Sequence, residues 1–393
     1  MTIEAVDPRA RGLRSRRTDA GVGALGVVAR LDWLLLAATA AAVAYGVWAI
    51  AGITRHDPGG SAASRQLLYA AAGSLLLVAG ILIDPIVYRR LYRSIYIGLV
   101  GVMGFVLIFG AATRGSKRWI NIGFFTFQPS EFGKVLLALA LAGFLADRAK
   151  QIDRLSVALR TIALAAGPVM LVWAQPDAGT AIVYIAVLTA VLFVAGVRWL
   201  HLALIWTVGL VAVLSVLWWL PAAGINVLKP YQAARLTAFA SATGQSSGTT
   251  SYNLTQSKIA VGAGGLRGRG VAGATQTALN YLPAHATDFA FASLAEQRGF
   301  FGASILLLLY LLIVWRGLKI VTTARDLFSA IVAAAIVFAF VIQVFVNVGM
   351  TVGIAPITGI PLPFVSVGGS SMISNLAGIG ILQAIHARGG RRR

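Results

Sequence analysis

The sequence predicts an all-α, polytopic membrane protein with about ten transmembrane helices. Of its 393 residues, 58% are hydrophobic and 12% are charged, whereas soluble domains carry roughly a quarter charged residues. The apolar residues fall into runs of about twenty, the length that spans a bilayer as a helix. Basic residues gather at the chain ends and between these runs. Together these observations favour a helical membrane bundle over a soluble domain.

Ten apolar runs qualify as membrane spans. An even number of spans places both termini on one side, and their basic residues make that side cytoplasmic. We therefore expect a single transmembrane domain over 31–387, with basic cytoplasmic tails at 1–30 and 388–393. The predicted spans are residues 31–53, 66–86, 93–112, 131–146, 157–174, 179–197, 200–221, 300–316, 328–350 and 367–387.

One connection, residues 222–299, is far longer than the others and is expected to be a large outer loop between the seventh and eighth helices. With the 113–130 loop it holds most of the basic residues predicted on the outer side, which indicates an anionic partner there or, alternatively, ordinary solvated loops. The net charge of +20 fits a membrane of anionic lipid better than nucleic acid. The basic residues of the long connection are Lys229, Arg235, Lys258, Arg267, Arg269 and Arg298.

The first candidate site lies around the predicted start of the fourth span. Lys117, Arg118, Glu131 and Lys134 fall at or inside the membrane boundary, although a charge near a helix centre costs about 2.5–3.5 kcal/mol. A chain that places four charges there is expected to use them on a charged ligand. Glu131 and Lys134 are three residues apart, so a structural ion pair explains these two equally well. Trp119 fits an interfacial aromatic anchor as well as a ligand contact.

Three further segments carry polar residues near the predicted outer boundary. Asp177 precedes a span and is expected to cap its N-terminus. The glycine-rich run 262–270 follows Lys258 and could cradle a phosphate, although it matches no nucleotide-binding fingerprint. The Pro- and Gly-rich segment 356–371 includes Ser370. Irregular backbone of this kind is tolerated near a membrane where it is buried in protein or lines a cavity, so it predicts a shaped cleft.

Asp288 is the candidate catalytic residue. It stands among apolar residues just before a predicted span, in Leu282-Pro283-Ala284-His285-Ala286-Thr287-Asp288-Phe289. Desolvation disfavours the charged form of a carboxylate and so makes it a better proton acceptor, as a general base requires. The alternative is a helix cap.

These blocks, taken in order over about residues 115–371, resemble the SEDS family of cell-wall polymerases, whose members include RodA and FtsW. The motifs are G-x-x-R-W-I from Gly115, Q-P-S-E-x-x-K from Gln128, and P-x-T-G-x-P-L-P-F-x-S-x-G-G-S-S from Pro356. The run 256–266 is more similar to the RodA members. The family usually has an acid and then His before Thr-Asp-Phe. Here Ala284 and Ala286 stand in those places, and His285 is displaced by one.

The resemblance implies an inverting peptidoglycan glycosyltransferase that polymerises lipid II into glycan strands at the outer face of the cytoplasmic membrane, with a role in cell shape. Asp288 would be the general base, and Lys117, Arg118 and Lys134 would stabilise the leaving diphosphate. Trp119 could stack on a sugar, and Glu131, Lys258 and Ser370 complete the expected substrate-binding residues.

The resemblance also implies a class B penicillin-binding transpeptidase as partner. The sequence leaves open whether a divalent cation assists the diphosphate, since no acidic cluster resembles a dedicated site. A lipid II flippase is the alternative function, and a non-catalytic scaffold is a third. The predicted intramembrane charges cluster at the outer boundary, which favours chemistry at a surface over transport.

Overall fold

The computed structural model describes residue 26 and residues 28–55, 62–113, 116–122, 125–222 and 249–389. Most of the two predicted basic tails lies outside these ranges. Residues 223–248 of the predicted outer loop, with Lys229 and Arg235, also lie outside them.

Each of the ten predicted spans corresponds to a helix. Within the described ranges, eight helices are long and apolar enough to cross a membrane. The other two are α10, which is shorter, and α18, which carries several Ser, Asn and Gln side chains. The ten helices are α3 (Trp33–Ile53), α4 (Ala62–Leu82), α6 (Tyr92–Phe109), α7 (Pro129–Ala146), α8 (Leu155–Ala174), α9 (Ala178–Ala195), α10 (Trp199–Leu214), α16 (Ala290–Thr323), α17 (Leu327–Val352) and α18 (Gly369–Arg388).

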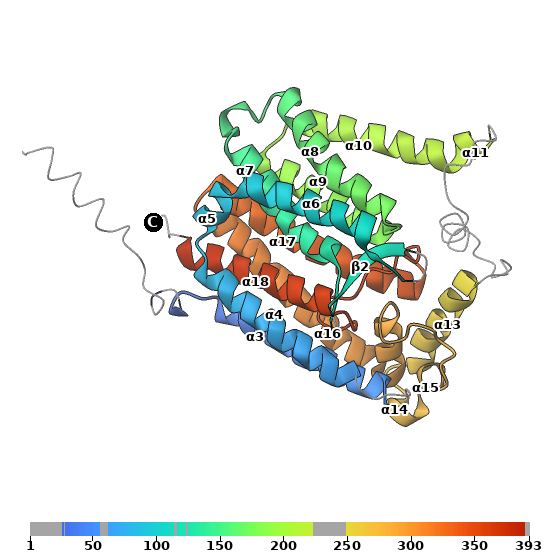
Figure 1. Cartoon of the computed structure of the whole chain (residues 1–393). Helices are drawn as coiled ribbons and strands as arrows, with labels where there is room; N and C mark the ends of the chain where they lie inside the picture. The colour runs from blue at the N-terminus through green and yellow to red at the C-terminus, as the bar shows by residue number, and fades with distance from the viewer. Residues whose placement is uncertain are drawn as a thin grey trace, which may run out of the picture.

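Short elements connect these helices. At one end of the bundle lie the short helix α5 (Pro85–Arg90) and the 3-10 turn η1 (Ala149–Gln151). Helix α10 continues through the π-helical turn η2 (Ser215–Trp219) into α11 (Leu220–Ala222). Helices α7, α9 and α17 are the most buried of the candidate spans, whereas α10 buries none of its residues and lies at the edge of the bundle (Figure 1). The bundle is therefore built around α7, α9 and α17.

A close glycine contact fixes α18 against α4. A Cβ added at Gly80 would lie 3.2 Å from the carbonyl carbon of Gly380, and one added at Gly380 would lie 2.3 Å from the oxygen of Leu77. Small residues let membrane helices approach this closely, so that their backbones pack against each other. This contact holds α18, whose first turn reaches the candidate site.

The 113–130 segment, predicted as a loop, forms a small antiparallel sheet and is the exception to the all-helical expectation. Strands β1 (Ala111–Thr113), β2 (Ser116–Ile122) and β3 (Phe125–Phe127) pair in the order β1-β2-β3. Trp119 lies opposite Ala111, and Ile120 lies opposite Phe127. The sheet sets β2 at one end of the bundle, between α6 and α7 (Figure 1).

The described chain ends meet at the opposite end of the bundle. The amide of Asp32, just before α3, donates to Gln383 Oε1 at 2.9 Å, and Gln383 Nε2 donates to Asp32 O at 2.8 Å. Arg316, near the end of α16, forms an ion pair with Asp32 at 2.6 Å. The start of α3 and the end of α18 therefore lie side by side, as an even number of spans requires.

The long segment before α16 is partly helical rather than an open loop. It contains α13 (Thr249–Gly264), α14 (Gly270–Gly273) and α15 (Thr275–Ala278). These helices lie near the same end of the bundle as the small sheet (Figure 1). Helix α16 starts at Ala290, earlier than expected, and its backbone breaks at Gly299, where φ is 66°.

The break at Gly299 is stabilised by the glycine-rich run 262–270. The amides of Phe300 and Phe301 donate to the carbonyls of Gly265 and Leu266, at 2.8 and 3.2 Å, so the amides freed by the kink are satisfied. A Cβ at Gly264 would lie 2.0 Å from Ala295 O, and one at Gly268 would lie 2.3 Å from Gln297 O. Gly264 and Gly268 therefore let the run pack closely on α16, and the phosphate cradle that the run suggested stays a prediction.

Candidate functional site

Asp177 organises one half of the candidate site. It caps α9, as expected, by accepting from the amide and hydroxyl of Thr180 at 3.2 and 2.9 Å. Gln128 Nε2 donates to Asp177 Oδ2 at 2.9 Å, and Ser130 Oγ donates to it at 3.4 Å. Arg118 Nη1 on β2 lies 3.8 Å from Asp177 Oδ1. One buried carboxylate thus joins the small sheet to the starts of α7 and α9.

Arg118 is held from two sides. Its guanidinium lies over the ring of Trp119 at 4.2 Å from the ring centroid, within the range of a cation–π interaction. Its side chain is 28% exposed, whereas that of Asp177 is 7% exposed. Arg118 therefore keeps a solvent-facing edge that an anion can reach. Lys117 precedes it on β2, and its side chain is outside the described set.

Ser370, in the first turn of α18, connects that helix to the sheet. Its hydroxyl accepts from the amide of Gln128 at 2.8 Å and donates to the carbonyl of Thr126 at 3.2 Å. Both contacts are to main chain at the junction of β3 and α7. In this structure Ser370 therefore positions the junction that carries Gln128.

Glu131 and Lys134 form a buried ion pair in α7. Lys134 Nζ donates to Glu131 Oε2 at 2.8 Å, and each side chain is 4% exposed. This confirms that the two residues can pair on one helix face. Breaking one partner of a buried pair costs about 3–5 kcal/mol, so any test of Lys134 must neutralise both residues.

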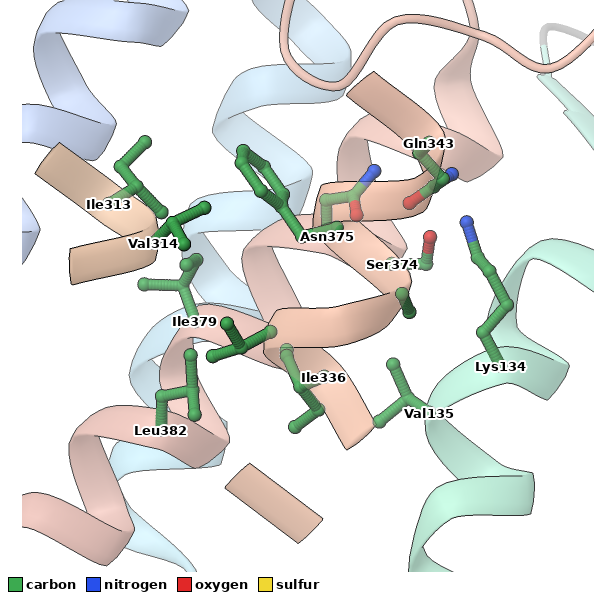
Figure 2. Close-up of a pocket in the computed structure, with 14 residues that line it drawn as sticks. Lys134, Val135, Ile313, Val314, Ile336, Gln343, Ser374, Asn375, Ile379 and Leu382 are labelled. Carbon is green, nitrogen blue, oxygen red and sulfur yellow. The ribbon is translucent and has the colours of Figure 1, made fainter. Parts of the chain in front are cut away.

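Lys134 also borders a cavity of about 30 Å³ between α7, α16, α17 and α18. Figure 2 shows the polar ends of Lys134, Gln343, Ser374 and Asn375 gathered in its upper part, with Ile379 and Leu382 below. The cavity is large enough for a water molecule. Both amide atoms of Gln343 are buried without a hydrogen-bond partner among the described residues, so the cavity offers polar groups to a small polar guest.

Asp288 lies in a tight turn before α16. The amides of Thr287 and Phe289 both donate to Ala284 O, at 3.0 and 3.2 Å. Ala284 adopts a left-handed φ of 56°, which is uncommon for a residue with a Cβ. Phe289 is the N-cap residue of α16 and makes no side-chain capping bond, so Asp288 is not the cap that the sequence offered as its alternative role.

The 353–368 connection fixes this turn. Asn347 on α17 donates from Nδ2 to the carbonyls of Asp288 and Ile360, at 3.1 and 2.7 Å. The amide of Val367 donates to Ala286 O at 2.9 Å. The Pro- and Gly-rich segment therefore packs against the Asp288 turn, as expected for irregular backbone that is buried in protein, whereas the cleft that the sequence predicted stays a prediction.

The same connection brings the two halves of the site together. A Cβ added at Gly179, in the first turn of α9, would lie 2.8 Å from both Thr358 O and Ile360 Cγ1. One added at Gly359 would lie 3.6 Å from Asp288 Oδ2. The 358–360 strip thus separates the cap of α9, with Asp177 and Arg118, from the carboxylate of Asp288. Asp288 and Trp119 consequently lie at one end of the bundle.

Lys258 stands beside this core rather than within it. It is exposed on α13, and its stem crosses the C-terminus of α17. A Cβ at Gly353 would lie 2.1 Å from Lys258 Cε. Glu296 is fully buried and accepts from the amides of Gln276 and Thr277, at 2.8 and 3.0 Å. Glu296 therefore anchors α15 to the first part of α16.

Sequence reasoning missed the polar residues of the cavity, Gln343, Ser374 and Asn375. A signal was present, because Gln343 and Asn347 are four residues apart in an otherwise apolar helix and so share one face. Polar residues within a membrane helix usually face the bundle interior. Within the described ranges, no group of three or more His, Asp and Glu side chains could hold a metal ion.

Comparison with known proteins gives one consistent family. Residues 28–389 match the family model for FtsW, RodA and SpoVE, described as "Cell cycle protein". The chain is similar to the peptidoglycan glycosyltransferase MrdB of Escherichia coli (strain K12). The two are 37% identical over 324 residues, which cover 82% of this chain and 85% of the relative.

Solved structures share the fold. A chain from the work titled "Structural coordination of polymerization and crosslinking by a peptidoglycan synthase complex" aligns with a TM-score of 0.76 at 29% identity, covering 91% of this chain and 97% of that one. The crystal structure of the Thermus thermophilus rod shape determining protein RodA aligns with a TM-score of 0.66 at 27% identity, covering 91% and 97%.

Proposed function

Because the chain belongs to the FtsW/RodA/SpoVE (SEDS) family, we propose that it is a peptidoglycan glycosyltransferase that polymerises lipid II, with Asp288 as general base. The observation that carries this proposal is the placement of Asp288. Its carboxylate lies beside the 358–360 strip, which packs on its other side against the start of α9, where Arg118 lies 3.8 Å from Asp177. A carboxylate and a cation on opposite sides of one rigid strip suit a proton acceptor and a leaving-group stabiliser.

The proposed step is a direct displacement. The acceptor sugar hydroxyl forms a new bond to the anomeric carbon of the donor as its proton passes to the Asp288 carboxylate. The bond from that carbon to the diphosphate oxygen breaks, and undecaprenyl diphosphate leaves with the electron pair. Attack from the opposite face inverts the anomeric centre. A diphosphate leaves readily once its charge is neutralised, so the step needs no separate general acid.

The cations supply that neutralisation in this proposal. Arg118, with its exposed edge, meets the diphosphate, and Lys117 adds charge from the same strand. Lys134, at the polar end of the cavity, adds positive charge from the first turns of α7. Fixed charges in a water-poor site stabilise developing negative charge strongly because they need no reorganisation during the step. Trp119, already packed on Arg118, offers a ring face to a sugar.

The remaining predicted residues act through position. Glu131 holds Lys134 in place, and Ser370 holds the junction of β3 and α7. Lys258, on the exposed side of α13, would meet the lipid-linked anion as it arrives.

We place the site at the outer face of the cytoplasmic membrane, with both termini cytoplasmic, on the charge bias of the connections. The chain has no cysteine, so single cysteines can report its orientation. Ser116→Cys and Thr255→Cys should react with a membrane-impermeant thiol reagent on intact cells, whereas Lys150→Cys should react only after lysis. Reaction of Lys150→Cys alone in intact cells would reverse the orientation.

We infer a crosslinking partner of the class B penicillin-binding type. Support comes from the similar chain whose work describes a peptidoglycan synthase complex that coordinates polymerisation and crosslinking. Co-purification with such a transpeptidase, retained after detergent exchange, tests this inference.

The deciding experiment gives purified protein fluorescently labelled lipid II. Wild type should form glycan polymer, and Asp288→Asn should form it at least about a hundredfold more slowly while it unfolds at the wild-type temperature. Lipid II that crosses vesicle membranes without polymer formation would replace this proposal with the flippase. If the protein neither forms polymer nor moves lipid II across the vesicle membrane, the scaffold function would replace this proposal. Polymer formation by Asp288→Asn at the wild-type rate would refute the general-base role.

A further inference from the structure

A second charged feature lies at the other end of the bundle, where α5 meets α6. Residues Pro85–Arg90 form α5, Leu91 breaks the helix, and α6 runs from Tyr92 to Phe109. An 18-residue helix is about 27 Å long, so this elbow is a membrane thickness away from the small sheet. The candidate active site does not use it.

The elbow encloses an open hollow lined by Ile86, Arg89, Arg90, Tyr92, Arg93 and Asp147. Three arginines and one aspartate leave a formal charge of +2 in it. Arg89 Nη2 lies 3.7 Å from Asp147 Oδ1, and Arg93 Nε donates to the hydroxyl of Tyr92 at 3.1 Å. All three arginines line the hollow and are exposed, so an anion outside the protein can reach them.

The wall of the hollow is built by α7. A Cβ added at Gly143 would lie 2.5 Å from Cγ of Tyr92, so the lack of a side chain there lets the ring lie directly against the helix. Asp147 follows one turn later and holds Arg89. The other acid nearby, Asp84, caps α5 by accepting from Ile86 N at 2.8 Å and pairs with Arg388 at 3.6 Å. The hollow therefore has a fixed wall and a net positive rim.

Apolar surface continues directly from this rim. Ile86 on α5, Leu91 between the two helices and Ile97 on α6 are 48%, 49% and 70% exposed. Planar guanidinium groups bind phosphate through paired hydrogen bonds. A positive hollow at the membrane boundary above an apolar helix face matches a molecule with an anionic phosphate head and acyl chains.

We propose that the α5–α6 hollow is a binding site for an anionic phospholipid, with its phosphate among Arg89, Arg90 and Arg93 and its chains along α6. The usual excess of basic residues on the cytoplasmic side of a membrane protein would explain arginines anywhere on that side. It would not require three of them to line the same hollow. The chain offers a matched comparison, because Lys150, Arg154 and Arg160 are exposed near the same end and do not line the hollow.

The test uses full-length protein in detergent and native mass spectrometry with added phosphatidylglycerol. Each basic residue near a membrane surface contributes about 1 kcal/mol, so Arg89→Gln/Arg90→Gln/Arg93→Gln should weaken lipid binding on the order of a hundredfold. The control Lys150→Gln/Arg154→Gln/Arg160→Gln removes the same charge and should bind as wild type does. Phosphatidylcholine should bind weakly to all three proteins.

Three results would overturn the proposal. Equal loss in both triple variants would indicate diffuse charge. Equal binding of phosphatidylcholine would indicate an apolar surface without headgroup selection. Displacement of phosphatidylglycerol by millimolar inorganic phosphate would indicate a site for a soluble anion. Unfolding temperatures of both variants in phosphatidylcholine bilayers check that the proteins are intact, and Arg90→Glu alone, which should also lose the lipid, provides a milder second variant.

Discussion

Asp177 and Asp288 are two acids at the same end of the bundle, separated by the 358–360 strip, and the chain treats them differently. The Asp177 carboxylate is surrounded by donors: Gln128, Ser130, Thr180 and, more distantly, Arg118. The main chain of Asp288 is fixed through Asn347 and the turn from Ala284. Asp288 is also half-buried, whereas Asp177 is buried.

We propose different roles for the two acids. The carboxylate of Asp177 joins the small sheet to the starts of α7 and α9, so its contacts give it a part in assembling the site. The main-chain contacts of Asp288 set the position of that residue independently of the protonation state of its carboxylate, which suits the proposed general base.

The largest expected effect is on catalysis. Asp288→Asn should reduce the rate of lipid II polymerisation by about 10²–10⁴-fold, the usual contribution of a general base, with no change in the unfolding temperature. Asp177→Asn serves as the matched control, because it also replaces a carboxylate by an amide in the same region. If Asp177→Asn lost as much rate as Asp288→Asn while remaining folded, the two acids would not differ in the way described.

The second prediction concerns Lys134. Glu131→Gln/Lys134→Met removes both buried charges, so neither is left unpaired. If Lys134 stabilises the leaving diphosphate, this double variant should fold normally and lose about 10²–10³-fold in turnover at saturating lipid II, as for removal of one preorganised donor. A stable double variant with the wild-type rate would show that the pair only supports α7.

Much of this comparison could be drawn from sequence. Helix positions followed from apolar runs, and Asp177 and Asp288 stood out as acids beside predicted spans. That the 358–360 strip would lie between the two acids could not be predicted, because it depends on the packing of Gly179 against Thr358 and of Gly359 beside the Asp288 carboxylate. The early start of α16 was missed since Glu296 and Arg298 interrupt its apolar pattern, and the kink at Gly299 mimics a helix start.

The cavity shows a different limit. Lys134, Gln343 and Ser374 come from three helices, and no local pattern says which faces of these helices meet. The sheet of residues 111–127 was also missed, because two of its three strands are only three residues long. The charged and polar residues were therefore visible in the sequence, whereas the residues that each of them contacts depended on how the helices pack.

The third prediction is a loss of stability. Asp177→Ala removes the cap of α9, which is worth about 1 kcal/mol. It also leaves the buried Thr180 hydroxyl without its acceptor, at about 1–3 kcal/mol, and leaves Gln128 Nε2 with Ser130 Oγ as its remaining acceptor. Thermal unfolding in detergent should therefore occur several degrees below wild type. Asp288→Ala, the matched change, should unfold close to wild type, and an equal loss in both would remove the distinction.

The smallest expected effect is the interaction energy between Arg118 and Asp177. Their closest atoms are 3.8 Å apart and the arginine is partly exposed, so a double-mutant cycle of Arg118→Gln and Asp177→Asn should give a coupling of only about 0.2–1 kcal/mol in unfolding free energy. A weak coupling means that Arg118 can turn to a diphosphate at little cost, as the proposed reaction requires. A coupling above about 2 kcal/mol would mark Arg118 as part of the Asp177 framework. The cationic half of the site would then fall to Lys117 and Lys134.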